Sequence, residues 1–312
     1  MFAAMLIHLE TANARIPWKR VKPPASENDL CRTPRKKDPV PSIPSPHRSI
    51  ADPVTVSAMP AFAPLFVPGV ETVSVRWISV VYRTSAAVVD AVLPRPLVAG
   101  AAHEVIIWIA EFRGARFTGA GGAVECRPDY MQGGINLRCR RGVVEGAYAV
   151  ETFVEGLNHG ILGREMFGLP KKQVRSVSLV DTPTGAEFAF VDAHGQHLLR
   201  GTASTGRTGA DRIAPVWFDT QYTAKLIPSA EGPHYDISRL VQIPFRLEAS
   251  GPLRTGDATV EWLESSSDPL HLLTQCAAPI AVWGVAQLDI DYGTYVAELD
   301  PSDIPVMGSP RW

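Results

Sequence analysis

The sequence predicts an α+β domain that is mainly antiparallel β, with a barrel-like sheet and a few short helices. Two observations favour this fold class. From about residue 70 onward, many short segments rich in Val, Ile, Trp and Tyr follow one another, as half-buried strands do. Helical segments are scarce, so the regular alternation of strands and helices that a parallel βαβ fold requires is missing.

The predicted elements begin with two strands that a short helix connects. The strands cover 73–83 (VSVRWISVVYR) and 104–112 (EVIIWIAEF). Thr84 or Ser85 would cap the helix between them, and Pro94 would end it. Further strands are predicted at 145–154, 173–181, 186–192, 217–227, 239–248, 257–264 and 283–298, and further helices at 157–167 and 268–276.

The first 62 residues predict a disordered extension. Ten of the 27 prolines fall within the first sixty residues, where nine Lys/Arg accompany five Asp/Glu and no apolar periodicity occurs. Such a segment buries too little apolar surface to offset the entropy of ordering it. Its opening, MFAAMLIHLE, lacks the basic start and the cleavage site of a signal peptide, and translation from near Met59 is an alternative interpretation. We expect one domain over 63–300, a loop-like tail at 301–312 and a cytoplasmic location.

The composition excludes several classes of protein. The chain has 312 residues with 30 Lys+Arg and 32 Asp+Glu, so its formal net charge is −2. This balance argues against nucleic-acid binding as the main activity. No run of about 18 uncharged apolar residues occurs, so no membrane span is predicted. The four cysteines lack C-x-x-C spacing, which indicates neither a zinc site nor a disulfide framework.

Motifs that bind nucleotides or activate serine are also missing. Gly119, Gly121 and Gly122 do not fit G-x-G-x-x-G, and no G-x-S-x-G occurs. The eight histidines are scattered without an H-x-x-x-H pair. We therefore expect a protein without a metal or an organic cofactor.

The segment GREMFGLPKK at 163–172 is the chemically interesting one. Consecutive side chains of an extended chain point to opposite faces, so Lys171 and Lys172 cannot both enter one pocket. A lysine buried among apolar side chains has a lowered pKa and attacks ketones as the free amine, forming a Schiff base. From this tripeptide alone, two solvated surface lysines are the more common arrangement.

GREMFGLPKK resembles the signature of the acetoacetate decarboxylase family, in which Gly-Arg-Glu and an apolar turn precede Pro-Lys-Lys. Two other segments are similar to the family in the same order: VVYRT (80–84) with LPRPL (93–97), and QYTAKLIPS (221–229). The resemblance covers roughly 70–298. It implies an acetoacetate decarboxylase-type barrel- or cone-like fold, a cofactor-free Schiff-base mechanism and a homo-oligomer.

The resemblance also implies roles for individual residues. Lys171 corresponds to the family's Schiff-base nucleophile, and Lys172 to the neighbour credited with lowering its pKa. Because the two ammonium groups should diverge, we expect burial to be the larger cause. Glu111 and Glu125 match two pocket glutamates of the family on either side of a glycine-rich turn. A hairpin with that turn would place both carboxylates at one end of the sheet, where they could share a proton.

Several positions differ from the family pattern. The family's decarboxylases carry an arginine, expected to face the substrate carboxylate, seven residues before the Tyr of Val-Tyr-Arg-Thr. Here that position is Val75, and Arg76, one residue away, is the candidate substrate contact. A shift by one residue moves a strand side chain to the other face. Glu151 replaces a family methionine and Leu169 a family aromatic residue, so both are candidate substrate contacts. Arg164 is another candidate, although a structural clamp on the Pro-Lys-Lys turn is the more common role of such an arginine.

These inferences predict a carboxy-lyase that decarboxylates a small β-keto acid through an iminium on Lys171. Two alternatives stay open. A relative with the same lysine could act as an aldolase-dehydratase or cyclase on a pyruvate-like keto acid, or the fold could hold a ligand without catalysis. In each case the expected partner is a small keto acid rather than a nucleic acid or a membrane.

Overall fold

The computed structural model describes residues 69–119, 122, 124–206 and 217–307. The predicted extension at 1–62 lies outside the described residues, as does the last part of the predicted tail at 301–312. Both remain predictions.

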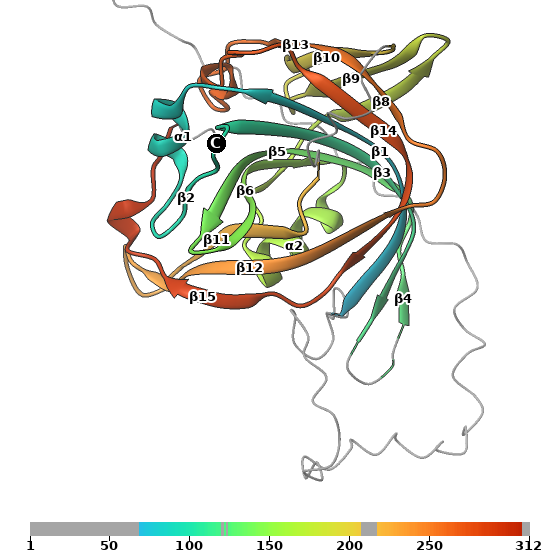
Figure 1. The fold of residues 1–312 in the computed structure, drawn as a ribbon. Helices are drawn as coiled ribbons and strands as arrows, with labels where there is room; N and C mark the ends of the chain where they lie inside the picture. Colours follow the sequence, from blue (N-terminus) through green and yellow to red (C-terminus); the bar gives the residue numbers. More distant parts are fainter. Residues whose placement is uncertain (1–68, 120–121, 123, 207–216, 308–312) are drawn as a thin grey trace, which may run out of the picture. The chain divides into compact units, whose positions relative to one another are not determined.

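Seven strands close into a ring, which is the centre of the fold (Figure 1). In spatial order these are β12 (Tyr235–Ala249), β11 (Thr220–Pro228), β6 (Val144–Val154), β5 (Tyr130–Arg141), β3 (Glu104–Thr118), β1 (Val70–Arg83) and β14 (Ile280–Ile290). The pairing of β14 with β12 completes the ring. Most neighbours are antiparallel, but β6 runs parallel to β11 and to the short β7 (Lys171–Gln173), so the sheet is mixed.

Further strands continue from β14 and cover one outer side of the ring. They are β13 (Arg254–Trp262), β10 (His197–Thr205), β9 (Gly185–Val191) and β8 (Ser176–Thr182). The short β2 (Val98–Ala99), β4 (Val124–Cys126) and β15 (Thr294–Glu298) pair with β5, β3 and β12. The described helices are α1 (Ala86–Val92), α2 (Leu157–Phe167) and the 3₁₀ turns η2 (Leu270–Leu272) and η3 (Pro301–Asp303).

The two faces of the ring strands bury two separate hydrophobic cores. On β1, Val75 and Trp77 face the interior of the ring, whereas Ile78 and Val80 face the layer formed by β8–β10 and β13. This alternation is the two-residue period of a strand. Helix α2 packs into the interior core through Leu162 and Phe167. Whether a residue holds an odd or an even position along a ring strand (its parity) therefore decides which core its side chain enters.

Gly114 reverses this parity within β3. Its φ of +60° is a conformation that glycine adopts without strain, and the register between β1 and β3 shifts at the same place. Before this bulge, Phe112 faces the interior; after it, Ala115 and Phe117 do. The strand then continues to Thr118, well past the predicted end at residue 112.

The structure confirms the predicted fold class and most of the predicted elements. Helix 157–167 has the predicted bounds, and the α1 helix begins after Ser85. The predicted helix at 268–276 is wrong, because that segment holds only a short 3₁₀ turn. Strands β5 and β10 were not predicted, and the segments 173–181 and 283–298 are each divided between two strands.

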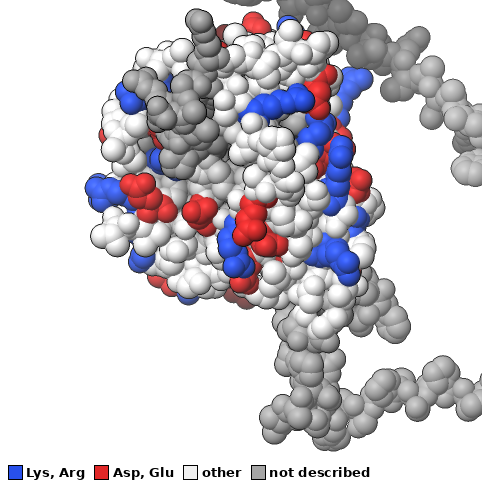
Figure 2. Space-filling model, turned by 45° about the vertical axis from the view of Figure 1, so that its right-hand side comes forward, with Lys and Arg blue, Asp and Glu red and all other residues white. Residues whose placement is uncertain are grey.

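Charged side chains are mixed in sign on the surface. On the face in Figure 2, acidic and basic side chains lie side by side among uncharged ones. Within the described ranges, no helix is long and apolar enough to cross a membrane. The same residues contain no group of three or more His, Cys, Asp or Glu side chains placed to hold a metal ion.

Candidate active site

The turn between α2 and β7 fixes the position of Lys171. Gly168 ends α2 with a φ of +68°, and its N–H donates to the carbonyl of Arg164 at 3.0 Å. A Cβ at Gly168 would lie 2.3 Å from the Cα of Lys225, so this position requires glycine. The guanidinium of Arg164 in turn donates to the carbonyl of Lys171 at 3.0 Å. Arg164 thus clamps the turn, and it lines neither of the two cavities that flank β7.

The two adjacent lysines enter different cavities, as the strand period predicts. Lys171 is 9% exposed and crosses α2 at Gly163, where an added Cβ would lie 2.6 Å from its Cε and 2.8 Å from its Nζ. Lys172 points away and contacts Glu151 at 2.6 Å and the carboxylate of Asp268.

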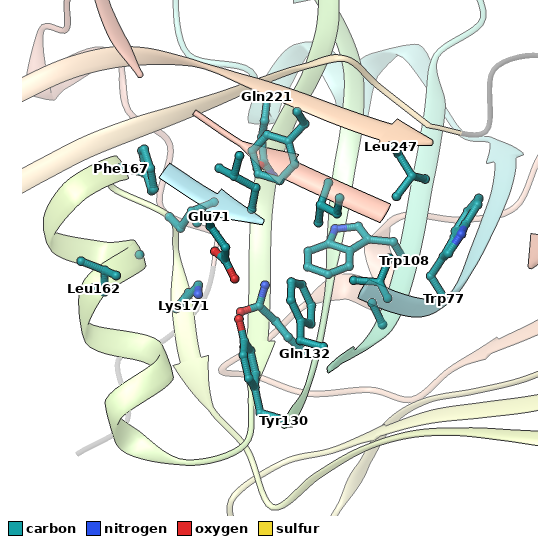
Figure 3. A pocket seen from close by; sticks show the side chains of 18 of the residues that line it. Glu71, Trp77, Trp108, Tyr130, Gln132, Leu162, Phe167, Lys171, Gln221 and Leu247 are labelled. Atoms are coloured by element: carbon teal, nitrogen blue, oxygen red, sulfur yellow. The ribbon is translucent and has the colours of Figure 1, made fainter. Parts of the chain in front are cut away.

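Lys171 ends in a cavity inside the strand ring (Figure 3). The Glu71 carboxyl group, the Tyr130 hydroxyl and the Gln132 amide point toward the same space as the Lys171 amine. Arg127 also lines this end of the cavity. The rest of the lining is largely aromatic and aliphatic: Val75, Trp77, Trp108, Ala110, Phe112, Phe117, Leu162, Gly163, Phe167, Leu169, Trp217, Phe218, Gln221, Phe245, Leu247, Leu288 and Ile290.

Burial brings the pKa values of Lys171 and Glu71 close together. Desolvation lowers the pKa of Lys171 to about 8, with a further lowering from the Arg127 charge and an opposing effect from Glu71. Desolvation raises the pKa of Glu71 to about 7, although Lys171 and Arg127 act against it. Near neutral pH part of Lys171 is therefore the uncharged amine, and Glu71 gains and loses its proton in the same pH range.

Arg127 is the second cation of the cavity. Its guanidinium lies over the Phe117 ring at 3.7 Å, and its Nε donates to Glu125 at 2.9 Å. Its side chain is 10% exposed. Burial is the larger cause of the low Lys171 pKa, as expected, and the neighbouring cation that contributes is Arg127 rather than Lys172.

β3 and β4 form the expected antiparallel hairpin between Glu111 and Glu125, but its register does not bring the two carboxylates together. Glu111 precedes the bulge and faces the outer side of the ring, where it accepts from Arg76 at 2.9 Å and from Arg113 at 2.7 Å. These bonds, Arg113 first, hold its pKa below the usual value. Glu125 pairs across from Phe117, six residues farther along β3. Neither glutamate lines the Lys171 cavity; Glu125 reaches it through Arg127.

Two other predicted substrate contacts also lie elsewhere. Arg76 pairs with Glu111 and donates to the carbonyl of Leu179 at 2.8 Å, because its parity places it outside the ring while Val75 lines the cavity. Glu151 lies in the second cavity with Lys172, and burial raises its pKa to about 8. Leu169, in contrast, does line the Lys171 cavity.

Five polar residues of the cavity were not predicted from the sequence: Glu71, Arg127, Tyr130, Gln132 and Gln221. One signal was available for Glu71, which shares the odd-numbered parity of Val75 and Trp77 on β1. Gln221 begins the family-like segment QYTAKLIPS, whereas Arg127, Tyr130 and Gln132 belong to no recognisable motif. Arg127 follows β4, and Tyr130 and Gln132 lie on β5.

Comparisons with known proteins show the family and the fold of the chain. The family profile described as Acetoacetate decarboxylase (ADC) matches residues 53–299. The chain belongs to the acetoacetate decarboxylase family. It is 26% identical over 254 residues to the acetoacetate decarboxylase of Chromobacterium violaceum, covering 77% of this chain and 93% of that protein.

Solved structures show the same fold. The acetoacetate decarboxylase of Legionella pneumophila superposes with a TM-score of 0.66 at 17% identity, over 77% of this chain and 92% of that one. The enduracididine biosynthesis enzyme MppR complexed with pyruvate gives 0.64 at 16% identity, over 80% and 99%. An acetoacetate decarboxylase-like enzyme from Sphingomonas wittichii RW1 gives 0.62 at 18% identity, over 79% and 100%.

Proposed function

We propose that this family member is a cofactor-free Schiff-base enzyme in which Lys171 forms an iminium with a keto acid. The observation that carries the proposal is the buried Lys171 amine, with a pKa near 8, facing Glu71 and Arg127 in one cavity. A pocket that merely binds a small acid has no need of a low-pKa amine beside a proton-sharing carboxyl group. We propose decarboxylation of a β-keto acid as the reaction.

The steps follow from the electron demand of the iminium. The free amine of Lys171 attacks the ketone carbon, and the oxygen leaves as water after protonation. The bond to the β-carboxylate then breaks, its electron pair passes to the iminium nitrogen, and CO2 leaves an enamine. A proton added to the terminal CH2 restores the iminium, and water releases the methyl ketone and the lysine.

The other polar residues have separate tasks in this sequence. Arg127 pairs with the substrate carboxylate and orients the bond that breaks. Glu71 donates and accepts the protons, since its pKa near 7 allows both forms at neutral pH. Tyr130 and Gln132, beside Glu71 in the cavity, bond the oxygen that departs as water.

Aldol chemistry is the second candidate, and one observation favours it. The cavity that holds Lys171 is also lined by Trp77, Trp108 and Trp217, whose rings would contact a second, aromatic substrate. An enamine formed from pyruvate on Lys171 could add to an aldehyde held there and then lose water. MppR, of the same fold, has been solved with the condensation product of pyruvate and imidazole 4-carboxaldehyde.

Borohydride trapping separates the candidates. The protein is incubated with acetoacetate or with pyruvate, reduced, digested and mapped by peptide mass spectrometry. An adduct on Lys171, absent from Lys171→Met, supports the Schiff base; acetone and CO2 from unreduced acetoacetate support decarboxylation. An adduct with pyruvate and no CO2 from acetoacetate favours aldol chemistry. Failure of both acids and of longer β-keto acids to form an adduct overturns the proposal in favour of a binding protein.

A pair of carboxyl variants tests the proton-transfer assignment. The geometry predicts that Glu71→Gln lowers kcat by about 10²- to 10³-fold, whereas the family resemblance assigns this role to Glu111. If Glu111→Gln causes the larger loss, Glu71 is not the acid and base.

A further inference from the structure

Five aromatic side chains form a continuous cluster along the Lys171 cavity: Trp77, Trp108, Trp217, Phe218 and Phe245. We call it the aromatic chamber. Trp217 makes edge-on contacts with Trp77 and Trp108, with ring centroids 5.7 and 6.4 Å apart, and it stacks on Phe218 at 4.7 Å. Phe218 continues the cluster to Phe245 at 5.9 Å. All five line the same cavity as Lys171.

Buried polar atoms of the chamber lack partners. The indole nitrogens of Trp77 and Trp217 and the amide nitrogen of Gln221 have no hydrogen-bond partner among the described residues. Trp77 is 3% exposed and Gln221 1%. Trp108 differs, because its indole donates to the Asn136 side chain at 2.9 Å. A buried donor without an acceptor costs about 1–3 kcal/mol, and a buried indole N–H usually finds a partner.

We propose that the aromatic chamber binds a flat, neutral arene of the substrate that carries a hydrogen-bond acceptor, joined to the keto acid that reacts with Lys171. This inference rests on the proposed function and names its substrate class. Stacked and edge-on aromatic walls favour an arene by shape and dispersion. The donors of Trp77, Trp217 and Gln221 select an acceptor, such as an ether or carbonyl oxygen, on that arene. A cationic group brings no acceptor and leaves these donors unpaired.

Acetoacetate fits this cavity incompletely. Its ketone and carboxylate match Lys171 and Arg127, but its methyl group leaves the chamber's donors unsatisfied. A β-keto acid with an aryl group two carbons beyond the ketone places that ring past Lys171 while the carboxylate stays at Arg127. The acid 3-oxo-5-(4-methoxyphenyl)pentanoate combines the ketone, the arene and the acceptor.

The test uses the full chain and three β-keto acids: acetoacetate, 3-oxo-5-phenylpentanoate and its 4-methoxyphenyl analogue. We expect kcat/KM for the phenyl acid to exceed that for acetoacetate at least tenfold, and the methoxy group to add about threefold to tenfold. Trp77→Phe and Trp217→Phe keep the ring and remove the N–H, so they should abolish the methoxy gain and retain the phenyl gain. Trp283→Phe is the matched control, since the Trp283 indole N–H is also unpartnered but lies in the other core.

A binding measurement separates the chamber from the chemistry. Titration calorimetry of Lys171→Met with 4-phenylbutan-2-one and its 4-methoxy analogue reports the chamber without a Schiff base. Tighter binding of the methoxy ketone, lost in Trp217→Phe, supports the chamber even if no keto acid is trapped on Lys171 and the proposed function fails. If acetoacetate is trapped on Lys171 while aryl acids react no faster and aryl ketones do not bind, the function stands and the aromatic chamber is refuted.

Discussion

Replacing each lysine of the Pro-Lys-Lys segment with methionine should change the stability of the fold in opposite directions. Lys171 holds a positive charge in a largely apolar cavity that lowers its pKa to about 8. Lys172 lies between two buried acids, Glu151 and Asp268, whose side chains are each 8% exposed. Lys171→Met therefore removes an unfavourable buried charge and leaves Glu71 beside the remaining cation Arg127. Lys172→Met, in contrast, leaves Glu151 and Asp268 without their cation.

The magnitudes follow from the pKa and from the geometry. A fall of the Lys171 pKa from 10.5 to about 8 corresponds to about 3 kcal/mol against folding when the amine is charged. Because methionine fills a similar volume, we expect Lys171→Met to raise the free energy of unfolding by about 1–3 kcal/mol at pH 7. Lys172 is half exposed, so solvent screens its ion pairs, and its loss should cost about 1–2 kcal/mol.

The pH dependence gives the sign of the Lys171 effect a second check. Between pH 8 and 10.5 the unfolded chain binds more protons at this lysine than the folded protein does, so wild-type stability rises with pH. The advantage of Lys171→Met is full below pH 8 and disappears above about 10.5. Urea denaturation at pH 7 and at pH 10 measures both. Equal destabilisation by the two variants, or a Lys171→Met advantage that does not shrink with pH, would refute the reasoning.

Three further predictions concern the reactivity of the lysine. The rate of borohydride trapping should increase with pH along a titration curve whose pKa is near 8, and Lys172→Met should leave that pKa unchanged. A shift of more than one pH unit in this variant would show that Lys172 does lower the pKa of Lys171. Gly163→Ala should reduce trapping at least tenfold while circular dichroism stays at wild type, because the new Cβ occupies the path of Lys171. Arg127→Met should raise the pKa of Lys171 and the KM of the keto acid, so an unchanged pH profile would contradict the assignment of Arg127.

The sequence predicted the part of the site that depends on local geometry. Three features follow from the periods of 3.6 and 2 residues within single segments. They are the helix at 157–167, the opposite directions of Lys171 and Lys172, and the Arg76 side chain that points out of the ring. Glu111 was misplaced because β3 continues past Gly114 through a bulge, so β4 pairs with residues 116–118 and not with the part of β3 that holds Glu111. A bulge depends on the partner strand, which the local sequence does not show.

Strand β5 was missed for a related reason. Its segment YMQGGINLRCRR contains Gly133 and Gly134, and glycine is a poor strand former. In the fold, a Cβ at Gly133 would lie 2.5 Å from the Phe190 ring, and one at Gly134 would lie 3.0 Å from the Trp108 indole nitrogen. The atom nearest to a Cβ at Gly134 is the Glu151 carbonyl oxygen, at 2.8 Å. Backbone and aromatic side chains of other strands therefore require both glycines, and packing across the sheet overrides the local preference.

The motif and the chemistry are therefore supplied by different parts of the chain. Within GREMFGLPKK, Gly163 makes room for Lys171, Arg164 and Gly168 hold the turn, and Lys172 secures the opposite face. Apart from Lys171 and Leu169, the groups that would contact a substrate come from strands and loops outside this segment, and the closed ring brings them together. A motif of this kind predicts a reactive lysine but not what the lysine reacts with. The substrate has to be inferred from the opposite wall of the cavity, where unpartnered donors among aromatic rings favour a larger and flatter acid than acetoacetate.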